Sequence, residues 1–152
     1  MKLHKIFLSL ALLTVIFSCT VRNTHQNIKQ GITGQVIYSS GNMMPGPDKK
    51  ESEGKGVQRE IFIYAVAAAS DAEGQAPLYT SIHTPLIATV KSDSLGFFQC
   101  KLKPGTYSVL TKEKDEHFFS GLSNDKGQLS PVEVLPDSVL RYIININYSA
   151  VY

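Results

Sequence analysis

The stretch from Val90 to Val109 most constrains what this chain can fold into. Its central residues alternate between apolar and polar, so that Phe98, Cys100 and Leu102 share one face of an extended chain while polar residues occupy the other. Turn-forming residues bound this alternation on both sides. The pattern predicts a strand with one face buried in a core.

The residues that follow this strand predict a reversal of the chain. Pro104 favours the first central position of a tight turn, and Gly105 accepts the positive φ, near +80°, that a type II turn requires at its second. A second strand should then begin, with Tyr107 and Val109 pointing inward. We therefore expect a β-hairpin here.

The same stretch resembles the carboxypeptidase regulatory-like domains, which have a transthyretin-like sandwich fold. The residues that carry the resemblance are turn formers and core positions: Asp93, Gly96, Phe98, Leu102, Pro104, Gly105, Tyr107 and Val109. More loosely, residues 31–36, 41–46 and 147–152 look like parts of small lipoproteins of Bacteroidetes-type bacteria that carry this domain. The resemblance implies an architecture and leaves the molecular role open, because one fold serves many functions.

Alternating or apolar runs elsewhere predict further strands. These runs are residues 31–38, 60–66, 86–91, 131–135 and 141–148, of which the second should be central and the last should sit well inside a sheet. Gly34 interrupts the first run, where a neighbouring backbone or large side chain is expected to approach closely. Residues 39–58, 67–85 and 120–130 are expected to be loops, and the second of them could contain a short helical turn. Together these features predict an all-β fold, a two-sheet antiparallel sandwich of about seven strands.

The N-terminus predicts export and lipid attachment. Residues 1–18 combine a basic start with a short apolar run, typical of a signal peptide, and the segment that ends at Cys19 resembles a bacterial lipobox. The alternative is an ordinary signal peptide with an incidental cysteine. We expect acyl chains on Cys19, a polar tether over residues 19–30 and one domain over residues 31–152. Resemblance to sorting signals favours the outer membrane, facing the periplasm, because no acidic export cluster follows Cys19.

Net charge and cysteine content limit which partners and which cysteine chemistry are expected. The formal net charge of +2 falls to zero when Lys2 and Lys5 leave with the signal peptide. The remaining lysines are dispersed, which argues against nucleic acid as a partner. With Cys19 acylated, Cys100 is left without a disulfide partner, and its place in the strand predicts a small core residue rather than a nucleophile.

No pattern of catalytic or metal-binding residues stands out. His25, His83 and His117 lack metal-ligand spacing, and no nucleophile elbow occurs, so we expect no enzyme activity, cofactor or metal. The candidate interaction residues are Met43, Met44 and Pro45 in the long loop. Their two adaptable thioether side chains could contact a partner, or could instead cover the open end of the core.

Two functions are the main hypotheses from this sequence, and an unrecognised hydrolase is the third. The first is a non-catalytic outer-membrane lipoprotein whose sandwich binds an envelope protein or has a structural role. The alternative is a lipoprotein that binds a carbohydrate or small molecule through the loops at one end of the sandwich, on tyrosines such as Tyr38, Tyr64, Tyr79 and Tyr142. The identity of the partner and the oligomeric state are left open.

Overall fold

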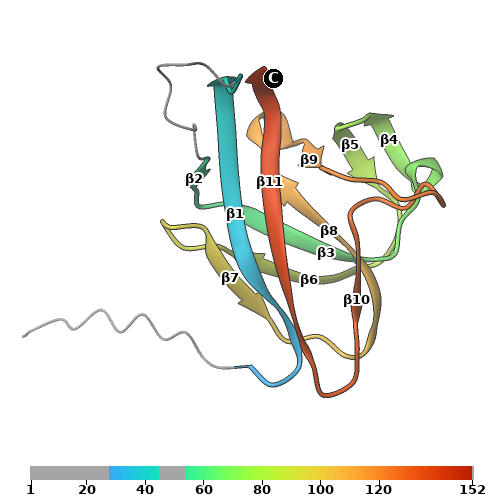
Figure 1. The fold of residues 1–152 in the computed structure, drawn as a ribbon. Coiled ribbons are helices and arrows are strands. Elements are labelled where there is room, and N and C mark those ends of the chain that lie inside the picture. The colour runs from blue at the N-terminus through green and yellow to red at the C-terminus, as the bar shows by residue number, and fades with distance from the viewer. Residues whose placement is uncertain (1–27, 45–53, 152) are drawn as a thin grey trace, which may run out of the picture.

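Two β-sheets form the protein, as the alternation predicted (Figure 1). The computed structural model describes residues 28–44 and 54–151. The first sheet contains β1 (Gly31–Asn42), β2 (Lys55–Gly56), β7 (Phe97–Cys100) and β11 (Val139–Val151). The second contains β3 (Glu60–Ala65), β4 (Ala72–Gln75), β5 (Leu78–Ile82), β6 (Leu86–Lys91), β8 (Gly105–Lys112), β9 (Phe118–Phe119) and β10 (Pro131–Val134). Two short 3₁₀ turns, η1 (Ala69–Asp71) and η2 (Lys114–Glu116), complete the described elements.

Strand β1 is the centre of the first sheet. One of its edges pairs with β11 in parallel, and its other edge pairs antiparallel with β7 and then with β2. The all-β prediction is thus confirmed, whereas pairing is mixed in this sheet and the described strands are more numerous than expected. The prediction that the last strand lies inside a sheet is wrong, because β1 is the one strand with which β11 pairs in the described part of the chain. Alternation gives a half-buried face to edge and central strands alike, so it could not distinguish them.

Strand β3 is central in the second sheet, as predicted. It pairs with β6 on one side and with β8 on the other. Strand β8 continues the sheet through β10 along its first half and β9 along its second. Pro131 opens β10 at the sheet edge, a position that tolerates its missing N–H group.

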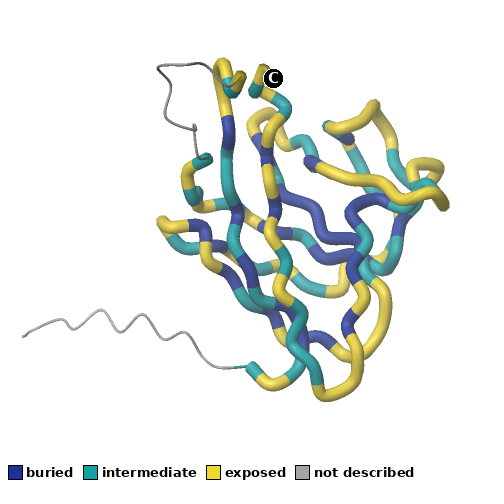
Figure 2. Tube along the Cα trace, in the orientation of Figure 1, coloured by how far each residue is buried: buried dark blue, intermediate teal, exposed yellow. Residues whose placement is uncertain are grey.

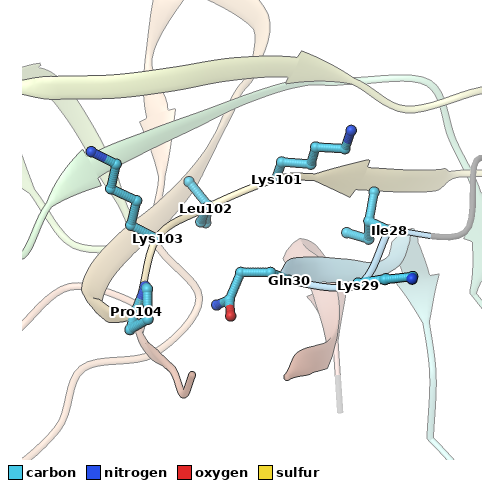
Figure 3. Close-up of a pocket in the computed structure, with 7 residues that line it drawn as sticks. All are labelled: Ile28, Lys29, Gln30, Lys101, Leu102, Lys103 and Pro104. Atoms are coloured by element: carbon cyan, nitrogen blue, oxygen red, sulfur yellow. The ribbon is translucent and has the colours of Figure 1, made fainter. Parts of the chain in front are cut away.

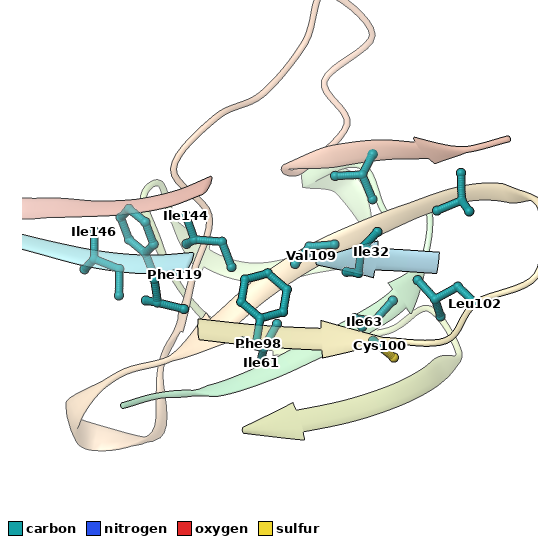
Figure 4. Close-up of a cluster of buried hydrophobic side chains, with 13 residues drawn as sticks. Ile32, Ile61, Ile63, Phe98, Cys100, Leu102, Val109, Phe119, Ile144 and Ile146 are labelled. Carbon is teal, nitrogen blue, oxygen red and sulfur yellow. The ribbon is translucent and has the colours of Figure 1, made fainter. Parts of the chain in front are cut away.

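The hydrophobic core lies between the two sheets (Figures 2 and 4). Its buried residues come from both: Ile32, Val36, Ile61, Ile63, Phe98, Cys100, Leu102, Val109, Phe119, Val132, Val134, Ile144 and Ile146. The predicted inward face of Phe98, Cys100 and Leu102 is therefore confirmed. Burial raises the pKa of the Cys100 thiol, which keeps it protonated and unreactive, as expected for a core cysteine.

The predicted hairpin around Pro104 and Gly105 is wrong. Strand β7 belongs to the first sheet and β8 to the second, so the intervening residues carry the chain from one sheet to the other. Gly105 has φ +153° rather than the value near +80° of a type II turn. The Tyr107 hydroxyl donates a hydrogen bond of 2.9 Å to the carbonyl oxygen of Lys103 and so ties this corner together. Val109 points into the core as predicted, but β8 also buries Leu110 on its other face, and β7 and β8 approach the core from opposite sides.

The turn before β7 matches its prediction. The Asp93 side chain accepts hydrogen bonds of 2.9 Å from the backbone N–H groups of Leu95 and Phe97. Gly96, at φ +86°, donates its N–H to the Asp93 carbonyl at 3.0 Å. The Asp and Gly of the motif therefore close one local turn that aims Phe98 into the core.

Two predicted loops contain regular structure. Within residues 67–85, η1 is the short helical turn that the sequence left open, but the antiparallel pair β4 and β5 follows it, so the prediction of a loop without strands is wrong. In the loop predicted over residues 39–58, residues 39–42 extend β1, and Lys55–Gly56 form β2. Strands β2 and β4 are short, polar and mostly exposed, and the sequence alone does not separate such strands from loop. No helix in the described ranges has the length and apolar character needed to cross a membrane.

Several predictions fall outside the described residues. They are the signal peptide over residues 1–18, Cys19, most of the tether over residues 19–30, and Pro45. Met43 and Met44 are described: Met43 extends the pairing with β11 through a bond of 2.8 Å from its N–H to the Val151 carbonyl, and Met44 is 49% exposed. Neither belongs to a core cluster, which argues against the core-cover alternative.

Candidate functional site

A buried ion pair lies where the second sheet meets the C-terminal ends of β1 and β11. Arg59 Nε is 3.1 Å from both carboxylate oxygens of Glu113, whose side chain is 1% exposed. The register explains the meeting: Glu60 of β3 pairs with Lys112 of β8, so the next residue beyond each strand faces the other. The pair is therefore a direct product of the β3–β8 ladder.

Ser92 fixes the backbone on the arginine side of this pair. Its hydroxyl accepts the N–H of Arg59 at 2.8 Å and donates to the Val57 carbonyl at 2.9 Å. Its own N–H donates to the Arg59 carbonyl at 3.0 Å. Ser92 is 1% exposed, so this clamp is shielded from water and holds Arg59 in place.

Two tyrosines from the first sheet complete the arrangement. The Tyr148 hydroxyl of β11 donates to Glu113 Oε2 at 3.2 Å. The Tyr148 ring packs edge-to-face on Tyr38 of β1, with centroids 6.2 Å apart. The Arg59 guanidinium lies over the Tyr38 ring at 5.6 Å, a cation–π contact. Both sheets thus contribute to one polar cluster at this end of the sandwich.

The cluster changes the acidity of Tyr148. Burial, the Glu113 carboxylate and the hydrogen bond to it together raise the Tyr148 pKa to about 12. An ordinary tyrosine ionises at about pH 10. The Tyr148 hydroxyl therefore makes its full contribution to the free energy of unfolding below about pH 10. That contribution is lost as the pH rises towards about 12, because Tyr148 ionises at a lower pH in the unfolded chain than in the folded protein.

This shift gives a testable prediction. Glu113→Gln removes the negative charge beside the hydroxyl, so the Tyr148 pKa should fall towards its ordinary value. Ring-carbon NMR of labelled tyrosine, titrated in wild type and variant, measures it residue by residue. A Tyr148 pKa that stays the same in Glu113→Gln would contradict the assigned role of the carboxylate.

A pocket of about 470 Å³ opens on this cluster. Its walls are formed by Tyr38, Arg59, Leu78, Glu113, Lys114, Asp115, His117, Tyr148 and Ser149. The η2 turn forms the rim, and there Asp115 and Glu116 have φ values of +61° and +64°. A hydrogen bond of 2.8 Å from the Glu113 N–H to the His117 carbonyl closes this turn. The size suits a small molecule, and polar groups converge on it from four separate segments.

Apart from His117, the pocket lining holds two cationic and two anionic side chains. Arg59 is neutralised by Glu113, and Lys114 is followed directly by Asp115 on the rim. The pocket therefore offers both donors and acceptors without a strong field of either sign. Such a lining favours a neutral polar ligand over a strongly charged one.

Sequence reasoning found part of this site. Among the tyrosines predicted as a binding platform, Tyr38 lines the pocket, whereas Tyr64 and Tyr79 are buried. Tyr142 is half-buried and lies outside the lining. Glu113 is buried although it lies in the run from Lys112 to Glu116, whose charged composition is typical of a solvated turn. The signal that could have found it is the strand register, which places Glu113 opposite Arg59.

A second polar group lies elsewhere, on the β4–β5 hairpin. His83 Nε2 is 3.4 Å from Ser81 Oγ and 3.2 Å from Glu73 Oε1, and the His83 and Glu73 side chains are 58% and 67% exposed. A catalytic triad uses the two ring nitrogens separately, one towards the nucleophile and one towards the acid. Here one nitrogen contacts both partners, so the group lacks triad geometry. Among the described residues no three His, Cys, Asp or Glu side chains gather as metal ligands.

Comparison of the chain with models of protein families, with curated proteins and with solved structures gives no match. Function is therefore inferred from the geometry of the pocket.

Proposed function

We propose that this protein is a non-catalytic binding module, presented at the bacterial outer membrane by lipid on Cys19. Its ligand would be a small, neutral, polyhydroxylated molecule such as a saccharide unit, bound in the pocket beside Arg59 and Glu113. The single observation that carries the proposal is the balanced charge of a pocket that is otherwise largely polar and aromatic: Arg59 is paired with Glu113, and Lys114 and Asp115 on the rim carry opposite charges.

The lining offers what a sugar requires. Hydroxyl groups both donate and accept hydrogen bonds, and the rim offers the Asp115 carboxylate as acceptor and the Lys114 amino group as donor. Guanidinium has five N–H donors, and the described contacts of Arg59 engage Nε with Glu113 and Nη1 with the Gln58 carbonyl. Leu78 and the tyrosine rings give apolar surface for the C–H face of a sugar ring.

The proposal predicts a selective loss on changing the rim. Asp115→Asn should weaken saccharide binding about tenfold, the effect of losing one hydrogen bond to a charged group. Asparagine tolerates the positive φ at this position, so the fold should be kept. NMR titration with a panel of neutral and charged saccharides measures the affinities.

Asp125→Asn is the matched control, because Asp125 is exposed in a turn and does not line the pocket. It should bind as wild type does. Binding of acidic saccharides alone, or an equal loss in both variants, would contradict the proposed ligand class.

A second candidate function is recognition of an envelope protein through Met43 and Met44, which follow β1. The observation that favours it is Met44, which is 49% exposed at the end of β1. Met43→Ser with Met44→Ser would then weaken capture of a protein partner while leaving saccharide binding intact.

A further inference from the structure

A second hollow, of about 630 Å³, lies at the end of the domain where the described chain begins (Figure 3). It is formed by Ile28, Lys29 and Gln30 on one side and by Lys101, Leu102, Lys103 and Pro104 on the other. These segments are the lead into β1 and the crossing from β7 to β8. The hollow is separate from the saccharide pocket and shares no residue with it.

The lining combines apolar surface with positive charge. Ile28, Leu102 and Pro104 are apolar, and Leu102 is also part of the core. Lys29, Lys101 and Lys103 are all exposed, and their side chains extend away from Leu102 in Figure 3. An apolar depression with ammonium groups around it suits a ligand that has both an anionic head and apolar parts.

Neighbouring residues extend this surface. Gln30 Nε2 donates to the Leu135 carbonyl at 3.0 Å, and Leu135 is 55% exposed. The Gly31 N–H donates to the Ser138 carbonyl at 3.0 Å, which places the Asp137 turn at the same end. The three lysines outnumber this carboxylate, so the surface keeps a positive balance.

The position of the predicted lipid anchor, Cys19, indicates which partner this surface contacts. Ile28 follows Cys19 by nine positions in the sequence. Nine residues span at most about 30 Å when fully extended. Lipid on Cys19 would therefore hold this end of the domain, rather than the saccharide pocket, nearest the bilayer.

We propose that the end of the domain formed by residues 28–30 and 101–104 docks on the anionic headgroup layer of the membrane. The inference rests on the proposed lipid anchor for its orientation, whereas the binding surface itself belongs to the folded domain. Lysine ammonium groups pair with lipid phosphates, and Ile28, Pro104 and Leu135 insert among the headgroups. Docking in this way directs the opposite end of the sandwich into the aqueous space.

The test uses the chain from residue 19 with Cys19→Ser, so that no lipid contributes to binding. Its partition onto vesicles of phosphatidylcholine, with and without phosphatidylglycerol, is measured by co-sedimentation. We expect binding to the anionic vesicles alone, weakening as salt is raised. Lys101→Gln with Lys103→Gln should reduce the partition coefficient about 25-fold, because each lysine near an anionic surface accounts for about fivefold.

Lys91→Gln with Lys126→Gln is the matched control, since both lysines are exposed and neither lines the hollow. An equal loss in the two double variants, equal binding to neutral and anionic vesicles, or no vesicle binding at all would overturn the proposal. Palmitate labelling of the wild-type chain reports the anchor separately, and saccharide titration of the lysine variants reports the pocket separately. Failure of docking is thus distinguishable from failure of the proposed function.

Discussion

Gly34→Ala is expected to lower the free energy of unfolding by more than about 4 kcal/mol, or to prevent folding altogether. A methyl group at this position would overlap the carbonyl of Tyr142 in β11 and would lie 3.1 Å from the Phe98 ring. Neither neighbour can move freely, because Gly34 pairs with Tyr142 on one side and with Phe98 on the other. Urea unfolding followed by circular dichroism measures the loss.

Gly127→Ala separates this steric effect from the general cost of replacing a glycine. Gly127 has φ +69°, and a methyl group there meets nothing within 4 Å. It should cost about 1 to 2 kcal/mol, the strain of a left-handed residue. Equal losses in the two variants would mean that β1, β7 and β11 do not meet as closely at Gly34 as the structure has them.

The close approach at Gly34 was one of the features that the sequence predicted well. A glycine weakens the interior of a strand, so its presence in an alternating apolar run itself indicates that a neighbouring group needs the space. Buried faces were equally clear: Phe98, Cys100 and Leu102 alternate in the sequence and are buried in the structure. Patterns of this kind are local, because the side chains of a single segment determine them.

Pairing partners were not predictable in the same way. The crossing at Pro104 and the edge position of β11 depend on which strand lies beside which, and alternation is the same for every choice. Strand β11 also pairs in parallel with β1, which brings together residues about one hundred positions apart. No short-range pattern encodes such a contact.

The candidate site could not be predicted from the sequence for a related reason. Glu113 lies in a run of charged residues that has the composition of a solvated turn, and its neighbours Lys114 and Asp115 are indeed exposed. Only the β3–β8 register turns Glu113 towards Arg59. The burial of the Glu113 carboxylate is therefore a consequence of the strand topology, and only the register of β3 and β8 predicts it.

Glu113→Ala should be the most damaging change of a polar residue in the described part of the chain. It leaves the Arg59 guanidinium, whose side chain is only 25% exposed, without its counter-ion and removes the acceptor of the Tyr148 hydroxyl. Breaking one side of a buried pair costs about 3 kcal/mol or more. The urea midpoint should fall accordingly, and the saccharide affinity proposed for the pocket should fall too, because Arg59 is no longer held by its counter-ion.

Glu116→Ala is the matched control for this change. Glu116 forms an ion pair with Lys112, but its side chain is 81% exposed, so its removal should leave the urea midpoint almost unchanged. Replacing both members of the buried pair, Arg59→Met with Glu113→Leu, should recover much of the stability lost in Glu113→Ala, because no uncompensated charge is then left inside. Saccharide affinity should stay low in that double variant, since the guanidinium is absent. If Glu113→Ala were no more destabilising than Glu116→Ala, the Arg59–Glu113 contact would have to be exposed to water, and the paired charges could no longer shape the pocket.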